Sequence, residues 1–349
     1  MLVEASVNLP FSCHGVEFSP FEGERMAVAS AQYFGIVGNG RLHVVDRCSG
    51  RDGGGGPSGS TARLREVRSF DTQAGLYDCA WSECHPRQLV TAGADGVVKL
   101  WDLETRDGFP VADWREHTQE VSGVDWNLVS KGVFASASWD GTVKLWQPGA
   151  RESSRTFRDH EQQHPVYGAI WNPFSPVQLL SFSGDGTARV LDVNSPGPGA
   201  GIVLDGHGGA EVLSGDWDKY NCPVVATGCA DGSIRLWDLR NPRRPLSLMV
   251  DGHRYAVKRL RFSPHPTGVL ATASYDMSVV LWDTTTNQST TLTVAAGNFE
   301  AGASPAPLAP RVLDRCVGHS EFVAGVAFSM LEPRLLATCA WDRRLCLWS

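Results

Sequence analysis

Residues 136–146 read SASWDGTVKLW, and this stretch decides the fold. Asp140 and Gly141 form an Asp-Gly pair between two short runs of strand-forming residues. Such a pair is a strong short-range signal for a tight turn that joins two antiparallel strands. The stretch therefore predicts a β-hairpin that closes with Trp146. Trp139, directly before the turn aspartate, is not explained by the hairpin.

The hairpin pattern recurs along the chain. Stretches aligned on the turn aspartate close with a Trp or Leu at positions 101, 146, 191, 237, 282 and 348, so the spacings are 45, 45, 46, 45 and 66. A degenerate copy, ASAQYFGIVGNGRLHVVD at residues 29–46, precedes them. Seven copies of one hairpin unit at a nearly fixed period predict an all-β repeat protein.

Composition limits the class of protein. The formal net charge of −7 argues against nucleic acid as a main partner, because phosphate binding requires a basic face. The N-terminus has no basic segment followed by an apolar core, and no window approaches roughly 18 apolar residues, so we expect neither a signal peptide nor a membrane-spanning helix. The nine cysteines contain no Cys-x-x-Cys pair and are interpreted as reduced thiols. We expect a soluble cytoplasmic protein.

The repeats resemble those of the WD-repeat β-propeller family over essentially the whole chain. The resemblance implies a seven-bladed β-propeller in which a polar tetrad locks each blade. In the blade quoted above the tetrad would be His117, Ser136, Asp140 and Trp146. A chain of hydrogen bonds through these side chains would satisfy polar groups that are costly to bury alone.

Other units match the tetrad to different degrees. Two match in full, with His253, Thr272, Asp276 and Trp282 in one and His319, Thr338, Asp342 and Trp348 in the other. The unit around Asp185 carries Leu191 in place of Trp, so we expect an incomplete network there. The unit around Asp95 has no upstream His, and Asp71 is the candidate replacement.

The ends of the chain and two insertions complete the predicted domain. The last repeat ends at Ser349 without an outer strand, and residues before His14 are the candidates to supply it, which would remove an exposed edge. We therefore predict one domain, residues 1–349. Residues 48–63 are read as a loop between the first two blades, and residues 284–310 as a loop before the entry strand of the last blade.

The sequence contains no catalytic or metal-binding pattern that stands out. It has no Gly-x-Ser-x-Gly, P-loop or His-Glu-x-x-His motif, and its Cys-His pairs have too few nearby ligands for a metal site. The tetrads already account for many of the His and Asp residues. We expect a binding protein with no metal and no cofactor, and not an enzyme.

A ring of side chains is expected around one mouth of the propeller channel. Counting back from the aromatic residue that ends each innermost strand gives the rim positions Ser12, Ala74, Glu120, Pro165, Glu211, Ala256 and Phe322. The residues before the turn aspartates should lie near the same face, namely Ala94, Trp139, Gly184, Ala230, Tyr275 and Trp341. Carboxylates beside aromatic side chains would suit a short basic, amphipathic segment. The alternative is that the aromatic residues pack between blades and the acids are solvated.

Several stretches outside the repeat consensus resemble the peroxin-7 family of import receptors. They are GVEFSPFEGERMAVASAQYFGIVGNGRLHVVD (15–46), SFDTQAGLYDCAWSE (69–83), EHTQEVSGVDWN (116–127) and DWDKYNCPVVATGCADGSIRLWDLRNPRRP (216–245). The resemblance implies that Glu120 meets the arginine of a type 2 peroxisomal targeting signal. At Ala74 the family tends to carry an acid, and Asp71 or Asp78 could replace it.

The resemblance also implies the partners. The family captures cargo proteins in the cytosol through an N-terminal nonapeptide, Arg-Leu, five residues, then His/Gln-Leu, which forms an amphipathic helix. A co-receptor peroxin closes over the helix, and docking peroxins at the peroxisomal membrane receive the complex. The receptor cycles between cytoplasm and peroxisome.

Two other classes of binding protein stay open. The stretch WDLR, from Trp237 to Arg240, fits the box found in adaptor propellers of cullin-4 ubiquitin ligases. A generic peptide- or histone-binding scaffold is the second alternative.

Overall fold

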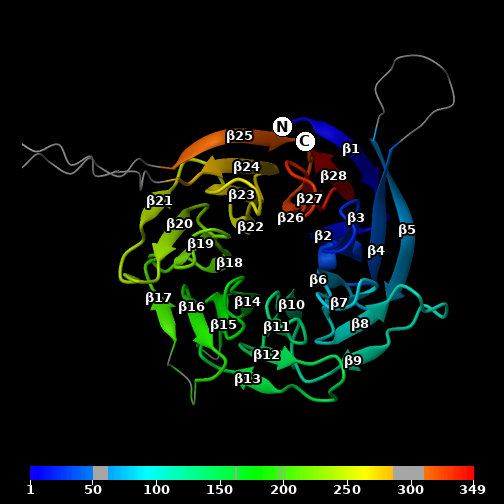
Figure 1. Cartoon of the computed structure of the whole chain (residues 1–349), viewed down its shortest axis with the longest axis horizontal. Helices are drawn as coiled ribbons and strands as arrows, with labels where there is room; N and C mark the ends of the chain where they lie inside the picture. The colour runs from blue at the N-terminus through cyan, green and yellow to red at the C-terminus, as the bar shows by residue number, and fades with distance from the viewer. Residues whose placement is uncertain (50–61, 162, 196, 198, 200, 286–309) are drawn as a thin grey trace, which may run out of the picture.

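The computed structural model describes residues 1–49, 62–161, 163–195, 197, 199, 201–285 and 310–349. Their strands form seven four-stranded antiparallel sheets arranged as a closed ring (Figure 1). This arrangement confirms the predicted seven-bladed β-propeller. We number the blades 1 to 7 along the chain.

Each blade is described from its innermost to its outermost strand. Blade 1 contains β2 (Ser12–Phe18), β3 (Arg25–Ala31), β4 (Gly40–Ser49) and β5 (Ala62–Thr72), with the short 3₁₀ helix η1 (Gln32–Gly35) after β3. Blade 2 contains β6 (Leu76–Trp81), β7 (Gln88–Gly93), β8 (Val98–Asp102) and β9 (Ala112–Trp114). Blade 3 contains β10 (Val121–Trp126), β11 (Phe134–Ser138), β12 (Val143–Trp146) and β13 (Arg155–Phe157).

The remaining blades follow the same order. Blade 4 contains β14 (Val166–Trp171), β15 (Gln178–Ser183), β16 (Ala188–Asp192) and β17 (Ile202–Leu204). Blade 5 contains β18 (Val212–Trp217), β19 (Val224–Cys229), β20 (Ile234–Asp238) and β21 (Ser247–Met249). Blade 6 contains β22 (Val257–Phe262), β23 (Val269–Ser274), β24 (Ser278–Asp283) and β25 (Arg311–Val317). Blade 7 contains β26 (Val323–Phe328), β27 (Leu336–Ala340), β28 (Arg344–Trp348) and β1 (Val3–Asn8).

The N-terminal strand closes the ring, as predicted. β1 pairs antiparallel with β28 from Val3 opposite Trp348 to Asn8 opposite Arg344. The two ends of the chain lie side by side in Figure 1. Arg47 of β4 binds Glu4 of β1 at 2.5 Å, so the closing strand is also tied to blade 1.

The hairpin turn explains why each unit carries glycine or a substitute after the aspartate. Gly141 has a φ of 79°, a left-handed conformation that glycine adopts without steric cost. Blades 6 and 7 place Met277 and Arg343 at this point, with φ values of 66° and 67°. These two turns therefore carry local backbone strain.

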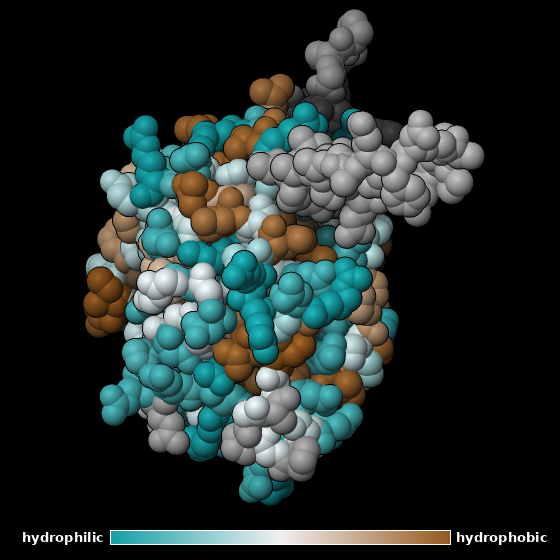
Figure 2. All heavy atoms as spheres, turned by 90° about the vertical axis from the view of Figure 1, so that its left-hand side faces the viewer, coloured by the Kyte–Doolittle hydropathy of each residue, from teal (hydrophilic) through white to brown (hydrophobic). Residues whose placement is uncertain are grey.

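The hydrophobic core is divided among the contacts between blades. In the described residues each neighbouring pair of blades shares one cluster of buried side chains. Figure 2 shows the outer side of the ring as a mixture of hydrophilic and hydrophobic residues. No described helix is long and apolar enough to cross a membrane.

The predicted insertions lie mainly outside the described residues, but their ends correct two expectations. β4 continues to Ser49 and β5 begins at Ala62, and these strands pair with each other within blade 1. The first insertion is therefore inside blade 1, not between blades 1 and 2. The second separates β24 from β25, so it lies within blade 6 and not directly before the innermost strand of blade 7.

Candidate functional site

Blade 3 contains a continuous hydrogen-bond network behind the turn. His117 Nδ1 lies 2.9 Å from Asp140 Oδ2, and His117 Nε2 lies 2.7 Å from Ser136 Oγ. Trp146 donates its indole N–H to the same hydroxyl at 2.8 Å. Burial opposes ionisation of Asp140, but hydrogen bonds from His117 and Thr142 hold its pKa well below the ordinary value.

The other complete networks have the same form. In blades 6 and 7 His253 and His319 lie between the turn aspartates Asp276 and Asp342 and the hydroxyls of Thr272 and Thr338, to which Trp282 and Trp348 donate. Blade 4 keeps His160, Ser181 and Asp185 but has Leu191 where the others have Trp.

Blades 1 and 2 depart from this pattern. In blade 2 Trp101 donates to Thr91, whereas Asp71, the expected substitute for His, instead pairs with Arg41 of blade 1 at 2.6 Å. Blade 1 builds a different chain, in which His43 lies between Ser30 and Glu66. The sequence pattern did not reveal this chain because no copy of the Asp-Gly turn marks it.

Backbone hydrogen bonds define which residues are equivalent at the rim. The residue before each turn aspartate donates its N–H to the rim residue of its own blade, as Trp139 does to Glu120 at 2.9 Å. The same bond joins Ala94 to Gly75, Gly184 to Pro165, Ala230 to Glu211, Tyr275 to Ala256 and Trp341 to Phe322. The rim position of blade 2 is therefore Gly75, and the predicted Ala74 is one residue too early.

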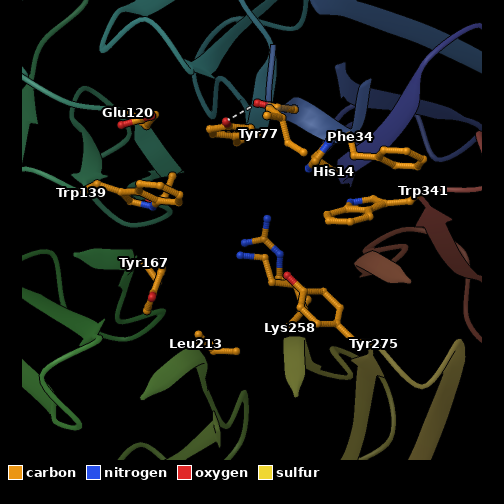
Figure 3. Close-up of a pocket in the computed structure, with 14 residues that line it drawn as sticks. His14, Phe34, Tyr77, Glu120, Trp139, Tyr167, Leu213, Lys258, Tyr275 and Trp341 are labelled. Carbon is orange, nitrogen blue, oxygen red and sulfur yellow. Dashed lines mark hydrogen bonds between the residues drawn. The ribbon is translucent and has the colours of Figure 1, made fainter. Parts of the chain in front are cut away.

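The rim surrounds a cavity at the end of the channel where the innermost strands begin, which we call the first mouth. The cavity has a volume of about 450 Å³. Figure 3 shows side chains from many blades converging on it. Its lining residues are His14, Phe34, Gly35, Ile36, Tyr77, Glu120, Ser122, Trp139, Tyr167, Leu213, Lys258, Arg259, Tyr275 and Trp341.

One side of the first mouth is a cluster of aromatic rings. Tyr275 stacks on Phe322 with ring centroids 4.6 Å apart, and Phe322 contacts Trp341 at 5.1 Å. Trp341 also contacts Phe34 at 5.4 Å. Trp139 lies across the cavity on the same side as Glu120 (Figure 3) and is 41 % exposed. The structure therefore brings the four predicted aromatic residues to one mouth.

The predicted acids are placed differently from one another. Glu120 lines the cavity, and Glu211 accepts a hydrogen bond from the Tyr167 hydroxyl at 3.0 Å beside it. Asp78 is buried and pairs with Arg259 at 2.7 Å, and Asp71 pairs with Arg41. Neither Asp71 nor Asp78 lines the cavity. Neither residue therefore supplies the cavity with the acid that was expected in place of Ala74.

The floor of the cavity carries two cations that the sequence reasoning missed. Burial and the charge of Arg259 lower the pKa of Lys258 to about 8, and its ammonium lies 5.7 Å from the Tyr167 ring. Most lining residues of the innermost strands stand two positions after a rim residue, as Lys258 does after Ala256 and Tyr167 after Pro165, whereas Arg259 stands three after Ala256. Because side chains alternate along a strand, a count of two from each rim position could have found Lys258, but not Arg259, which follows an irregularity in the strand register.

Two polar atoms at the first mouth have no partner in the described part of the chain. His14 Nε2 and Trp341 Nε1 are both buried without a hydrogen bond. Burial, with a smaller effect of Lys258, lowers the pKa of His14 to about 3, so its ring is neutral. Unpaired buried polar atoms are costly, and a ligand that bonded to them would remove that cost.

Comparison with known proteins places the chain in a family. The model "WD domain, G-beta repeat" matches residues 64–102, 108–147, 201–238, 244–283 and 311–349. The "Peroxisomal targeting signal 2 receptor" of Saccharomyces cerevisiae is 32 % identical over 97 % of this chain and 97 % of its own length. The protein of the same name from Komagataella phaffii is 32 % identical over 97 % of this chain and 96 % of its own length. "Peroxisome biogenesis protein 7" of Arabidopsis thaliana is 39 % identical over 37 % of this chain and 38 % of its own. The chain therefore belongs to the WD40-repeat family and, within it, to the peroxisomal targeting signal 2 receptors.

Proposed function

We propose that this chain is a cytosolic import receptor that binds the type 2 peroxisomal targeting signal of cargo proteins at the first mouth. The observation that carries the proposal is the cavity of about 450 Å³ with aromatic rings along one side and Glu120 along the other. The role is one of binding, in keeping with the receptor names of the relatives. The proposal includes cycling between the cytosol and the peroxisome.

The signal and the cavity match in chemistry. In a helical nonapeptide the two leucines are seven residues apart and share one face, and so do the arginine and the His/Gln. The leucine face would pack on Tyr275, Phe322 and Trp341, since aromatic side chains provide large apolar contact areas. The arginine would pair with Glu120 at the rim, because Lys258 and Arg259 repel a cation from the floor.

A second protein would complete the site. Trp139, Phe34 and Ile36 line the cavity and remain substantially exposed. We infer that a co-receptor peroxin covers the bound helix and these side chains, and that docking peroxins at the peroxisomal membrane receive the complex. Trp237 donates to Thr227 within blade 5 and the exposed Arg240 pairs with Asp238, and these bonds do not distinguish an adaptor from a receptor; the receptor names of the relatives favour the receptor.

The first prediction tests this assignment by reversing one charge. Glu120→Lys should weaken binding of a fluorescent Arg-Leu-x5-His-Leu peptide at least roughly 30-fold, about 2 kcal/mol, because it replaces the arginine's partner with a like charge. Fluorescence anisotropy, with and without the co-receptor peroxin, measures the change. The free energy of unfolding should change by less than about 0.5 kcal/mol, since the side chain lies on a rim.

A matched control makes the same charge change elsewhere on blade 3. Glu152 is exposed and does not line the cavity, so Glu152→Lys should bind the peptide like the wild type. No binding by the wild-type chain in either condition would overturn the proposed function. A collapse of stability in Glu120→Lys would instead assign Glu120 a structural role.

A further inference from the structure

The opposite end of the channel contains a second cavity, at the last residues of the innermost strands, which we call the second mouth. Its volume is about 390 Å³. Residues 125–126, 170–171 and 261–262 line it, whereas the first mouth is lined by earlier residues of the same strands, such as Ser122, Tyr167 and Lys258. The two cavities are therefore separate surfaces of the ring.

At the second mouth, carboxylates from three blades each bind the backbone of the next blade. Glu17 accepts the N–H of Trp81 at 2.6 Å, and Asp125 accepts that of Trp171 at 2.7 Å. Asp216 accepts the N–H of Phe262 at 2.8 Å and also binds Lys219. These bonds fix the carboxylates in position around the channel axis.

Two of these carboxylates can each accept a further hydrogen bond. In the described chain Glu17 and Asp125 each bond through one oxygen only, so the second oxygen of each is available. Burial raises the pKa of both groups, to about 7 for Asp125, and Arg261 compensates only in part. A further cation in the cavity would stabilise the ionised carboxylates.

Acidic side chains outnumber basic ones in the second mouth. Glu17, Glu83, Asp125 and Asp216 line it, against Lys219 and Arg261. Lys219 is already paired with Asp216 at 2.8 Å. The described residues contain no group of three or more ligands that could hold a metal ion, so the excess of acid suits the cationic end of an organic side chain.

The rim of the second mouth is apolar and open. Phe174, Tyr220 and Met330 line the cavity and are 47 %, 49 % and 51 % exposed. Trp171, which also lines the cavity, has a buried indole N–H with no partner in the described chain. The apolar rim and the unused donor add a hydrophobic contact and a site for a backbone carbonyl.

We propose that the second mouth is a second peptide-binding site, which takes a short partner segment with one arginine or lysine flanked by aromatic or aliphatic residues. The cation enters between Glu17 and Asp125, the flanking side chains cover Phe174, Tyr220 and Met330, and a backbone carbonyl accepts the Trp171 N–H. The site is independent of the first mouth, so both ligands bind at once.

The experiment uses the purified full chain and an array of heptapeptides. Each peptide has a central arginine, flanking positions drawn from Trp, Phe, Leu, Met, Pro and Gly, and a twin with citrulline in place of arginine. The best arginine peptide, measured by fluorescence anisotropy, should bind at least tenfold more tightly than its citrulline twin. A failure of every peptide to distinguish arginine from citrulline would overturn the proposal.

Variants locate the peptide on the structure. Glu17→Gln combined with Asp125→Asn removes the charge but keeps an acceptor for each backbone N–H, and should weaken binding at least tenfold. Phe174→Ser, at an exposed rim position, should weaken binding severalfold even if the double variant fails to fold. Glu120→Lys should leave this binding unchanged, and all the second-mouth variants should retain the targeting peptide at the first mouth.

Three further results would contradict the proposal. One is equal binding by wild type, the double variant and Phe174→Ser; another is loss of the arginine peptide in Glu120→Lys. The third is a concentration-dependent dimer in sedimentation that Phe174→Ser dissociates, because it would identify a second copy of the chain as the occupant.

Discussion

At the scale of single residues, carboxylates in this ring fall into two groups with opposite electrostatics. Asp140, Asp185, Asp276 and Asp342 accept hydrogen bonds within the blades, and these bonds lower their pKa values despite burial. These carboxylates stabilise the fold at pH values above the ordinary carboxyl pKa, and that stabilisation is lost only as the pH falls into the acid range. Asp125 behaves in the opposite way, because burial raises its pKa to about 7.

The prediction at this scale concerns Asp125→Asn. Between roughly pH 4, the ordinary aspartate value, and pH 7, the native state holds a proton at Asp125 that the unfolded chain releases, so the wild type loses stability as pH rises. The positive charges of Arg261 and Lys219 reduce the rise in the pKa of Asp125, and the negative charge of Asp216 increases it. Asparagine cannot ionise and keeps an acceptor for Trp171.

Urea denaturation at several pH values measures the effect. Asp125→Asn should be more stable than the wild type by about 1 kcal/mol or more at pH 8, and the difference should shrink towards pH 5. Asp113→Asn, at an exposed ion pair with Arg115, is the matched control and should show no such trend. A constant difference across this range would contradict the assigned cause.

At the scale of elements, β1 joins the two ends of the chain. Ala5 and Leu9 of the N-terminal segment are buried in the cluster between blades 7 and 1. Removal of the segment would also leave β28 as an unpaired edge strand, whose free backbone N–H and C=O groups can pair with other chains.

Deletion of residues 1–10 should therefore lower the free energy of unfolding by at least about 3 kcal/mol, mainly through lost apolar burial and strand pairing. The loss should appear in one cooperative transition in urea, since blade 7 is part of the ring. Leu2→Ser, at an exposed position of the same segment, is the control and should have little effect. An unchanged midpoint after the deletion would contradict a role for β1 in closure.

At the scale of the whole molecule, one ion pair joins blades that are not neighbours. Arg259 of blade 6 binds Asp78 of blade 2 at 2.7 Å, and Asp78 also accepts the N–H of Val124 in blade 3. Both charged side chains are largely buried. Breaking such a pair leaves an uncompensated buried charge.

Arg259→Met should therefore destabilise the ring by about 3–5 kcal/mol, and the double variant Asp78→Asn with Arg259→Met should recover much of that loss. Urea denaturation of the wild type, both single variants and the double variant gives the coupling energy. Additive effects of the two substitutions would show that the pair does not couple the two blades.

Much of the fold and part of the candidate site could be predicted from local pattern. The hairpin at Asp140 repeats with a nearly constant period, so the blade count and the closing strand followed from the sequence. Trp139, Tyr275 and Trp341 were placed near one mouth by the same counting. The insertions were assigned to the wrong connections because a spacing of 66 residues does not show which turn of a blade has grown.

The sequence by itself determined the seven units and the complete hydrogen-bond networks of blades 3, 6 and 7, because each of these units folds through contacts within about one period. Only the tertiary structure decided what meets at the channel. Asp78 and Arg259 are 181 residues apart, and Glu17 reaches Trp81 across a blade boundary. Curvature of the closed ring brings such residues together, and no local pattern encodes the resulting distances, the pairing of Arg259 at the first mouth or the convergence of the carboxylates at the second.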